Sequence, residues 1–251
     1  MDHQKLKLFK PNEVRILAFG NSLTEGYTDF GTRFHPYAIE LQNKLSQLVS
    51  DFKVTVDVDG KSGDRVLPSL QGIFFQRIQS SCPIHKQNSP KYDLVIILGG
   101  TNDLAFLIND PVGPSQIFEG LKACYDHVLQ SGTSLLCLTI PERSIDTRTS
   151  ELAKKAREAR LELNEKITEF VKLSQGTKEA ETGVTDDQIG GSTHAGRVFL
   201  MDLAAIVPFP PDQKEDEQFE SQIWSPDGLH MSSHGYDFVG QELGSYIHGL
   251  I

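Results

Sequence analysis

Residues 14–26 read Val14-Arg15-Ile16-Leu17-Ala18-Phe19-Gly20-Asn21-Ser22-Leu23-Thr24-Glu25-Gly26. An almost wholly apolar run ends here in a turn of glycine and polar residues. A short apolar run bounded by turn residues is typical of a strand that is buried on both faces of a parallel sheet. We therefore expect a strand at Val14–Phe19 that delivers Ser22 to its carboxyl end, the edge at which open α/β sheets bind ligands.

The same pattern recurs in the middle of the chain, where Leu94-Val95-Ile96-Ile97-Leu98 runs into Gly99-Gly100-Thr101-Asn102-Asp103. Asn102 should therefore lie at the same edge of the sheet as Ser22. Apolar runs predict strands at Val14–Phe19, Lys53–Val58, Tyr92–Leu98, Ser134–Thr139 and Arg197–Asp202. Helices are predicted between and after them, near Pro36–Val49, Pro114–Gln130, Thr149–Leu173 and Ser233–Gly249.

Strands that alternate with helices indicate an α/β fold in which right-handed crossovers connect parallel strands. We expect a single three-layer, doubly wound domain over residues 1–251. Its five-stranded parallel sheet should have the flavodoxin-like strand order 2-1-3-4-5. The polar stretch Ser174–Gly196 has neither a helical nor an alternating apolar period, so it predicts a loop insertion near residues 174–196.

Composition and charge exclude several classes of protein. The chain has 251 residues, 38% of them hydrophobic, which is enough to build a sizeable core. Its formal net charge of -10 would repel a phosphate backbone, so we expect no nucleic-acid partner. No apolar run approaches the ~20 residues that cross a bilayer, and Met1–Lys10 has no apolar core of signal-peptide length. We therefore expect a cytoplasmic protein with no membrane span.

A third motif, Asp227-Gly228-Leu229-His230, lies near the end of the chain. Taken with the serine and asparagine motifs, it makes the chain resemble the SGNH hydrolases, also called the GDSL lipase/esterase family. That family is named for a serine, a glycine, an asparagine and a histidine, for which the candidates here are Ser22, Gly63, Asn102 and His230. Asn21 stands where the family commonly has aspartate, a change that removes a charge and keeps local hydrogen bonding.

The resemblance implies a catalytic triad of Ser22, His230 and Asp227. A serine hydroxyl is a poor nucleophile until a base removes its proton, and His230 would be that base. Asp227 would orient the imidazole and stabilise the imidazolium that forms. Taken alone, Ser22 would be read as a helix N-cap and His230 as a capping or core histidine; the motifs together favour catalysis. The order serine, aspartate, histidine also fits the α/β-hydrolases, but Ser22 lacks their Gly-x-Ser-x-Gly elbow.

The resemblance also implies an oxyanion hole, formed by the backbone N–H groups of Ser22 and Gly63 and by the side-chain amide of Asn102. Gly63 follows the second predicted strand in the stretch Gly60-Lys61-Ser62-Gly63-Asp64, where Gly60 is the other candidate and a plain turn is the alternative interpretation. Asn102 can offer an N–H donor that its neighbour Asp103 cannot, so we expect Asp103 to brace the loop.

This resemblance favours a serine esterase that hydrolyses small-molecule carboxylic esters, with short acyl or acetyl groups, through an acyl-enzyme intermediate. Leu104, Phe106 and Trp224 are candidates to line the acyl pocket; the alternative is that they anchor the loops as core residues. Two other functions remain open. An acyltransferase of the same fold would pass the acyl group to an alcohol or a sugar, and a flavodoxin-like binding module would have no catalytic triad.

Neither a cofactor nor a metal is implied. His234 lies four residues after His230, but no third ligand is near them in the sequence. Cys82, Cys124 and Cys137 are odd in number and widely spaced, which fits neither a disulfide framework nor a zinc site. We expect all three thiols to be reduced.

Overall fold

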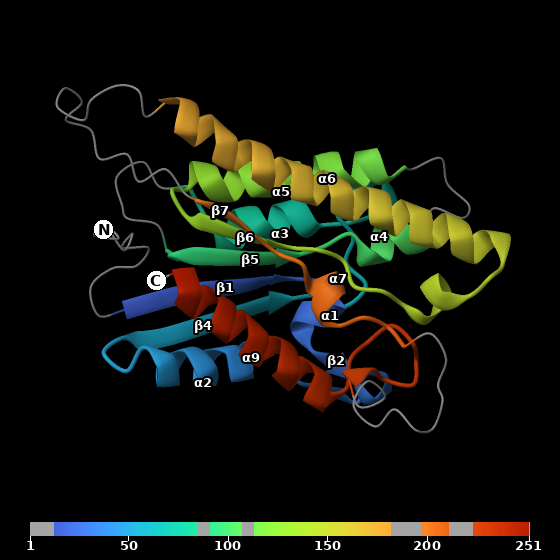
Figure 1. The fold of residues 1–251 in the computed structure, drawn as a ribbon, viewed down its shortest axis with the longest axis horizontal. Coiled ribbons are helices and arrows are strands. Elements are labelled where there is room, and N and C mark those ends of the chain that lie inside the picture. Colours follow the sequence, from blue (N-terminus) through green and yellow to red (C-terminus); the bar gives the residue numbers. More distant parts are fainter. Residues whose placement is uncertain (1–12, 85–90, 107–112, 182–196, 211–222, 251) are drawn as a thin grey trace.

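The computed structural model describes residues 13–84, 91–106, 113–181, 197–210 and 223–250, and the side chains of the third range as far as Gln175. In this part of the chain, a central sheet is built from β1 (Glu13–Gly20), β4 (Lys53–Gly60), β5 (Leu94–Leu98), β6 (Ser134–Leu138) and β7 (Val198–Met201). The strand order is β4-β1-β5-β6-β7, and every neighbouring pair is parallel (Figure 1). Numbered along the chain, this is 2-1-3-4-5, so the predicted fold class and strand order are confirmed.

Helices cover both faces of the sheet and make the three predicted layers (Figure 1). One face carries α2 (Ala38–Leu48) and α9 (Ser233–Leu250), and the other carries α3 (Phe74–Ser81), α5 (Pro114–Gln130) and α6 (Glu151–Glu181). Strand β5 shows why a central strand of the sheet is apolar throughout. Leu94, Ile96 and Leu98 enter the core beneath α2 and α9, whereas Val95 and Ile97 enter the core beneath α5 and α6.

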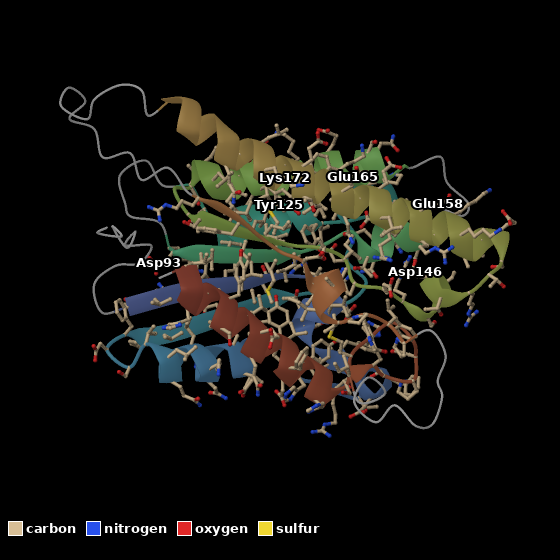
Figure 2. The ribbon with its side chains drawn as sticks, in the orientation of Figure 1. Asp93, Tyr125, Asp146, Glu158, Glu165 and Lys172 are labelled. Atoms are coloured by element: carbon tan, nitrogen blue, oxygen red, sulfur yellow. The ribbon has the colours of Figure 1, made fainter. Side chains whose placement is uncertain are left out.

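Helix α6 has the amphipathic character that its sequence predicts. Leu163 and Ile167 are fully buried against the sheet, while Glu158, Glu165 and Lys172 point away from it (Figure 2). A helix that covers one face of a sheet needs only one apolar side, and the charged side remains in water.

The same helix extends further than expected. It continues to Glu181, so the loop predicted at 174–196 begins too early, and residues 182–196 lie outside the described part of the chain. Five of the eight added residues are good helix formers, namely Gln175, Lys178, Glu179, Ala180 and Glu181, so the segment can continue a helix without an apolar period. A hydrophobic period in the sequence reveals only the part of a helix that packs against the rest of the protein.

Helix α3 was not predicted from the sequence, and several shorter elements were not predicted either. They are α1 (Ser22–Glu25), β2 (Tyr27–Thr28), η1 (Asp29–Gly31), β3 (Arg33–Phe34), η2 (Pro68–Leu70), α4 (Thr101–Phe106), η3 (Ser144–Thr147) and α7 (Leu203–Ile206). Strands β2 and β3 pair as an antiparallel hairpin. Of the others, α1, α4 and α7 directly follow β1, β5 and β7, so they lie at the carboxyl edge of the sheet, where Ser22 and Asn102 were predicted.

The cysteines are buried and free, as expected for reduced thiols. Burial raises the pKa of Cys124 to about 12, so its thiol is protonated at neutral pH. In the described residues, no helix combines the length and the apolar character that a bilayer span requires.

Candidate active site

The turn after β1 presents Ser22 as the first residue of α1. Gly20 is required there because a Cβ atom would lie 2.5 Å from the carbonyl oxygen of Leu98. Asn21 caps the helix, since its Oδ1 accepts a hydrogen bond from the backbone N–H of Leu23 at 3.2 Å. Its Nδ2 is buried and has no partner among the described residues. The family that the sequence resembles commonly has aspartate at this position. An aspartate side chain has no N–H group that could remain without a partner here.

Ser22, His230 and Asp227 meet at the carboxyl edge of the sheet. The Oγ of Ser22 lies 2.9 Å from Nε2 of His230, and Nδ1 of His230 lies 2.7 Å from Oδ2 of Asp227. Because Nδ1 faces a carboxylate, it is the nitrogen that carries the proton. Nε2 is therefore free to accept a hydrogen bond from the hydroxyl of Ser22. The structure thus brings together the three residues proposed from the sequence, in the orientation that a serine nucleophile needs.

Asp227 is held in place by its own turn. Its Oδ1 accepts hydrogen bonds from the backbone N–H groups of Leu229 at 3.0 Å and His230 at 2.9 Å. Burial acts to raise the pKa of Asp227, but the hydrogen bonds from His230 and Leu229 and the charge of His230 outweigh it, so the pKa lies below its ordinary value of 3.8. Asp227 is therefore ionised at neutral pH and can stabilise an imidazolium at His230.

Tyr27 is a site residue that the sequence analysis missed. Its ring lies on the ring of His230, with centroids 4.2 Å apart and planes tilted by 34°. The hydroxyl of Tyr236 donates a hydrogen bond to the backbone oxygen of Tyr27 at 2.9 Å. Tyr27 immediately follows the serine motif, but no local pattern indicates that its ring reaches a histidine at the other end of the chain.

Asn102 is another polar residue of the candidate site. It lies in α4, directly after β5, and its Nδ2 donates a hydrogen bond to the backbone oxygen of Asp64 at 2.8 Å. An amide nitrogen carries two N–H bonds, so one donor remains after this contact. Asn102 and the loop that contains Gly63 are therefore joined, as an oxyanion hole built from both would require.

Gly63 is an exposed residue in that loop. It has a φ of 74°, and a Cβ atom built on it would meet nothing within 4 Å, so open space adjoins it. Gly60 is different, because a Cβ atom there would lie 2.2 Å from the backbone nitrogen of Glu25. Of the two candidates, Gly63 is the one with room for a substrate beside it.

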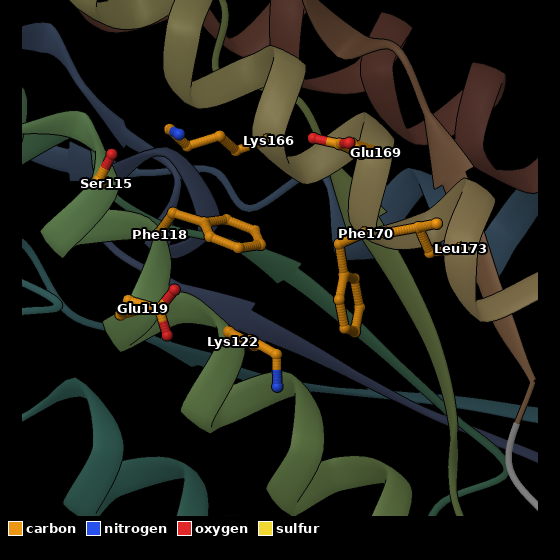
Figure 3. A pocket seen from close by; sticks show the side chains of 8 residues that line it. All are labelled: Ser115, Phe118, Glu119, Lys122, Lys166, Glu169, Phe170 and Leu173. Atoms are coloured by element: carbon orange, nitrogen blue, oxygen red, sulfur yellow. The ribbon is translucent and has the colours of Figure 1, made fainter.

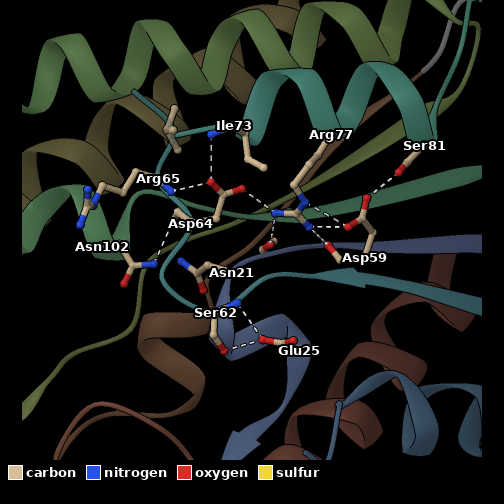
Figure 4. Close-up of polar contacts among 12 residues, drawn as sticks. Asn21, Glu25, Asp59, Ser62, Asp64, Arg65, Ile73, Arg77, Ser81 and Asn102 are labelled. Carbon is tan, nitrogen blue, oxygen red and sulfur yellow. Dashed lines mark hydrogen bonds and ion pairs between the residues drawn. The ribbon is translucent and has the colours of Figure 1, made fainter. Parts of the chain in front are cut away.

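Arg77 ties this loop to the ends of two strands (Figure 4). Its Nη1 donates to Oδ2 of Asp64 at 2.7 Å and to the backbone oxygen of Gly20 at 3.1 Å, and its Nη2 donates to the backbone oxygen of Asp59 at 2.6 Å. The other carboxylate oxygen of Asp64 accepts from the backbone N–H of Ile73 at 3.0 Å. One guanidinium therefore holds the end of β1, the end of β4 and the loop with Gly63 together.

Asp103 braces the same loop from the other side, as expected. Its two carboxylate oxygens accept hydrogen bonds from the backbone N–H groups of Val66 and Leu67, each at 3.0 Å. Burial raises the pKa of Asp103 despite those hydrogen bonds. The role is structural, since its acceptors are occupied by the loop.

The three candidate pocket residues have different surroundings. Leu104 is 1% exposed and belongs to the core beneath α5 and α6. Trp224 is also buried, and its Nε1 donates to the backbone oxygen of Pro208 at 3.1 Å. Both fit the anchoring alternative rather than a pocket wall. Phe106 is 41% exposed, with the guanidinium of Arg65 3.9 Å from its ring centroid, and remains a candidate.

A groove between α5 and α6 lies apart from these residues (Figure 3). The rings of Phe118 and Phe170 form part of its wall, and charged side chains such as Glu119 and Lys166 surround them. None of the predicted site residues lines it. The candidate active site is therefore the edge with Ser22, His230 and Asn102.

Several known proteins resemble this chain. A model of the GDSL-like lipase/acylhydrolase family matches residues 18–238, whereas no curated protein sequence matches the chain. Similar solved structures include a putative arylesterase from Agrobacterium tumefaciens, with 19% identity, a TM-score of 0.61 and coverage of 95% of this chain and 100% of that one. A carbohydrate acetylesterase from Sinorhizobium meliloti has 16% identity, a TM-score of 0.58 and coverage of 95% and 100%. A lipase/acylhydrolase from Enterococcus faecalis has 20% identity, a TM-score of 0.53 and coverage of 94% and 96%.

Proposed function

Since this chain belongs to the GDSL-like lipase/acylhydrolase family and is an ester-hydrolysing enzyme, we propose that Ser22, His230 and Asp227 form the catalytic triad that cleaves its substrate. The observation that carries the proposal is the unbroken contact from Ser22 Oγ to His230 Nε2 at 2.9 Å and from His230 Nδ1 to Asp227 Oδ2 at 2.7 Å. A nucleophile, a base and a group that orients the base are the parts that acyl transfer through serine requires.

In the first step, Ser22 Oγ attacks the ester carbonyl while Nε2 of His230 takes the hydroxyl proton. The carboxylate of Asp227 stabilises the imidazolium. Negative charge develops on the carbonyl oxygen, where the backbone N–H groups of Ser22 and Gly63 and the free N–H of Asn102 would stabilise it. The carbon–oxygen bond to the alcohol then breaks, and His230 gives its proton to the departing alkoxide.

In the second step, a water molecule attacks the acyl group on Ser22. Nε2 of His230 takes a proton from that water, the same donors stabilise the oxyanion, and the bond to Ser22 Oγ breaks as His230 returns its proton to the serine. The products are a carboxylic acid and the restored enzyme.

The acyl group is short, and acetyl is the first candidate. The carbohydrate acetylesterase from Sinorhizobium meliloti supports this choice, because it shares the fold over 95% of this chain. A series of p-nitrophenyl esters from acetate to decanoate would test it, with kcat/KM expected to be highest for acetate or butyrate. A maximum at decanoate would contradict a short acyl group.

Replacement of the nucleophile tests the triad. Ser22→Ala should lower kcat by ~10⁶-fold, as loss of a triad serine does, and should abolish labelling by a fluorophosphonate. Ser80→Ala is the matched control, because Ser80 is exposed on α3 and donates only to the backbone oxygen of Gln76. A Ser22→Ala enzyme within about tenfold of the parent would overturn the assignment.

The whole chain is also proposed to form one domain. Support comes from the shared sheet, because both hydrophobic cores use alternate residues of the same strands. A sheet buried on both faces cannot lose one layer of helices without exposing apolar strand residues to water.

A further inference from the structure

A row of aromatic rings leads outward from the catalytic histidine. The ring of Tyr27 lies on His230, and the ring of Phe34 lies edge-on to Tyr27, with centroids 6.0 Å apart and planes at 85°. Phe34 is 52% exposed, and Phe30, at the tip of the same hairpin, is 69% exposed. We call Tyr27, Phe30 and Phe34 the aromatic hairpin. Its rings give apolar surface to solvent beside the candidate active site.

The base of this hairpin is firmly attached to the rest of the fold. The backbone N–H of His35 donates to the oxygen of Gly26 at 2.7 Å, and Nε2 of His35 lies 2.7 Å from Oδ1 of Asp237 in α9. The hydroxyl of Tyr236 holds the backbone of Tyr27. The base of the hairpin and the ring of Tyr27 therefore have a defined position relative to His230.

The backbone at the tip of the hairpin adopts an unfavourable conformation. Asp29 has a φ of 49° and Phe30 a φ of 55°, a left-handed conformation that side chains with a Cβ rarely adopt. Gly31, with a φ of 80°, continues the turn. The strain at Phe30 brings no burial in return, because most of its ring faces solvent. Strained residues of this kind cluster at active sites and ligand-binding segments.

The chemistry of ester cleavage indicates which part of the substrate would lie here. His230 must give its proton to the departing alcohol oxygen, so the alcohol portion leaves from the His230 side of Ser22. The acyl carbonyl points to the other side, toward Gly63 and Asn102. The aromatic hairpin lies on the His230 side, since Tyr27 is in contact with that ring.

We propose that the aromatic hairpin binds the alcohol portion of the ester and selects apolar alcohols, above all those with an aromatic ring. This inference rests on the proposed function. An aromatic alcohol can stack on, or meet edge-on, the exposed rings of Phe34 and Phe30, and such pairs stabilise a complex beyond the simple burial of area. A small aliphatic alcohol reaches neither ring and gains less.

Two acetates that differ only in the alcohol test the proposal. Benzyl acetate and ethyl acetate present the same acyl group and alcohols of similar acidity, so the ratio of their kcat/KM values reports binding of the alcohol. The wild-type enzyme should prefer benzyl acetate, and Phe34→Ala should lower that ratio about three- to tenfold. The ratio of ethyl butyrate to ethyl acetate, which reports the acyl side, should change much less.

Two further variants distinguish a lost contact with the substrate from misfolding of the protein. Phe30→Asn places a residue that tolerates the left-handed region at the strained position, so it should retain or raise the thermal midpoint while lowering the benzyl preference. Leu161→Ala is the matched control, because Leu161 is an apolar residue of α6 that is 52% exposed. It should leave both substrate ratios as they are.

The outcomes distinguish a failure of the hairpin proposal from a failure of the proposed function. If the protein reacts with a fluorophosphonate and cleaves both acetates, but shows no benzyl preference or keeps it in Phe34→Ala, the hairpin proposal is wrong and the triad stands. If Phe34→Ala alters the acyl ratio instead, the substrate lies the other way round and the proposal is also wrong. If the wild-type protein neither reacts nor cleaves either ester, the proposed function fails and the hairpin proposal falls with it.

Discussion

Asp227 differs from an ordinary surface aspartate because its neighbours hold it in the charged form. The hydrogen bonds from His230 and Leu229 keep its pKa below 3.8 even though burial opposes them. A carboxyl with a lowered pKa in the folded protein adds to stability above its ordinary pKa, and that contribution is lost as the pH falls through the folded value. Throughout the range where a histidine titrates, Asp227 therefore keeps its charge.

This charge predicts a simple pH dependence. Hydrolysis requires His230 in its neutral form, so kcat/KM should rise with pH and then level off. Since Asp227 does not titrate in that range, the acid limb should have a slope of one in a plot of log kcat/KM against pH. The measurement is a pH–rate profile on an acetate ester. A slope of two would show that a second group titrates with His230, and a flat profile with chemistry rate-limiting would contradict a histidine base.

Asn102 has one amide N–H committed to Asp64, which leaves the other for the proposed oxyanion hole. Asn102→Ala should lower kcat by ~10²–10³, or about 3–4 kcal/mol of transition-state stabilisation, with a smaller change in KM. Asn102→Asp should be at least as damaging, because it places a negative charge where negative charge develops. Steady-state kinetics measure the effect, and urea unfolding shows whether the loop has been disturbed. Normal kcat with a raised KM in both variants would make Asn102 a substrate-positioning residue.

At the scale of elements, the proposed active site depends on loops that the hydrogen bonds of the sheet do not hold in place. The loop between β4 and α3 carries Gly63, and the side chain of Arg77 on α3 holds that loop against the ends of two strands. The carboxylate of Asp64 is 2% exposed, so it needs the charge of Arg77 to compensate for its lost hydration. The side chain of Arg77 is 12% exposed and also forms an ion pair with the carboxylate of Asp59.

Removal of that partner should be costly. Arg77→Met keeps much of the side-chain length and leaves Asp64 as a buried, unpaired charge, so the free energy of unfolding should fall by about 3–5 kcal/mol. Arg77→Lys should recover only part of the loss, because an ammonium group cannot match the spread of contacts that the guanidinium makes. Urea titration measures both variants. Arg148→Met is the control: Arg148 is exposed, and its replacement should cost less than about 0.5 kcal/mol. Equal stabilities for the two methionine variants would contradict the role given to Arg77.

At the scale of the whole molecule, two cores share one sheet. Leu243 of α9 belongs to one core and Leu121 of α5 to the other, and both are fully buried. Each leucine replaced by alanine should lower the free energy of unfolding by about 2–5 kcal/mol, because a cavity is left behind. The two effects should add to within about 0.5 kcal/mol in the double variant, since the sites lie on opposite sides of the sheet. Urea unfolding followed by fluorescence and circular dichroism should show one transition in all three variants, and two separate transitions would contradict a single domain.

The sequence by itself determined the framework. Apolar runs such as Leu94–Leu98 require burial on both faces, so strands of this kind with helices between them specify a parallel sheet. The polar motifs begin where those runs end, which places Ser22 and Asn102 at one edge of the sheet. These features are local: hydrophobic periodicity and turn residues are present in a short window of sequence.

Tertiary structure alone decided the details around that framework. Leu104 and Trp224 are apolar, and only packing shows that they enter the core rather than face a substrate. The contact of Tyr27 with His230, and the hold of Arg77 on Asp64, join segments whose residues carry no shared pattern. The physical reason is that such contacts depend on which side chains the packed sheet and helices make neighbours, since buried hydrogen-bonding groups and charges must then be satisfied by those neighbours.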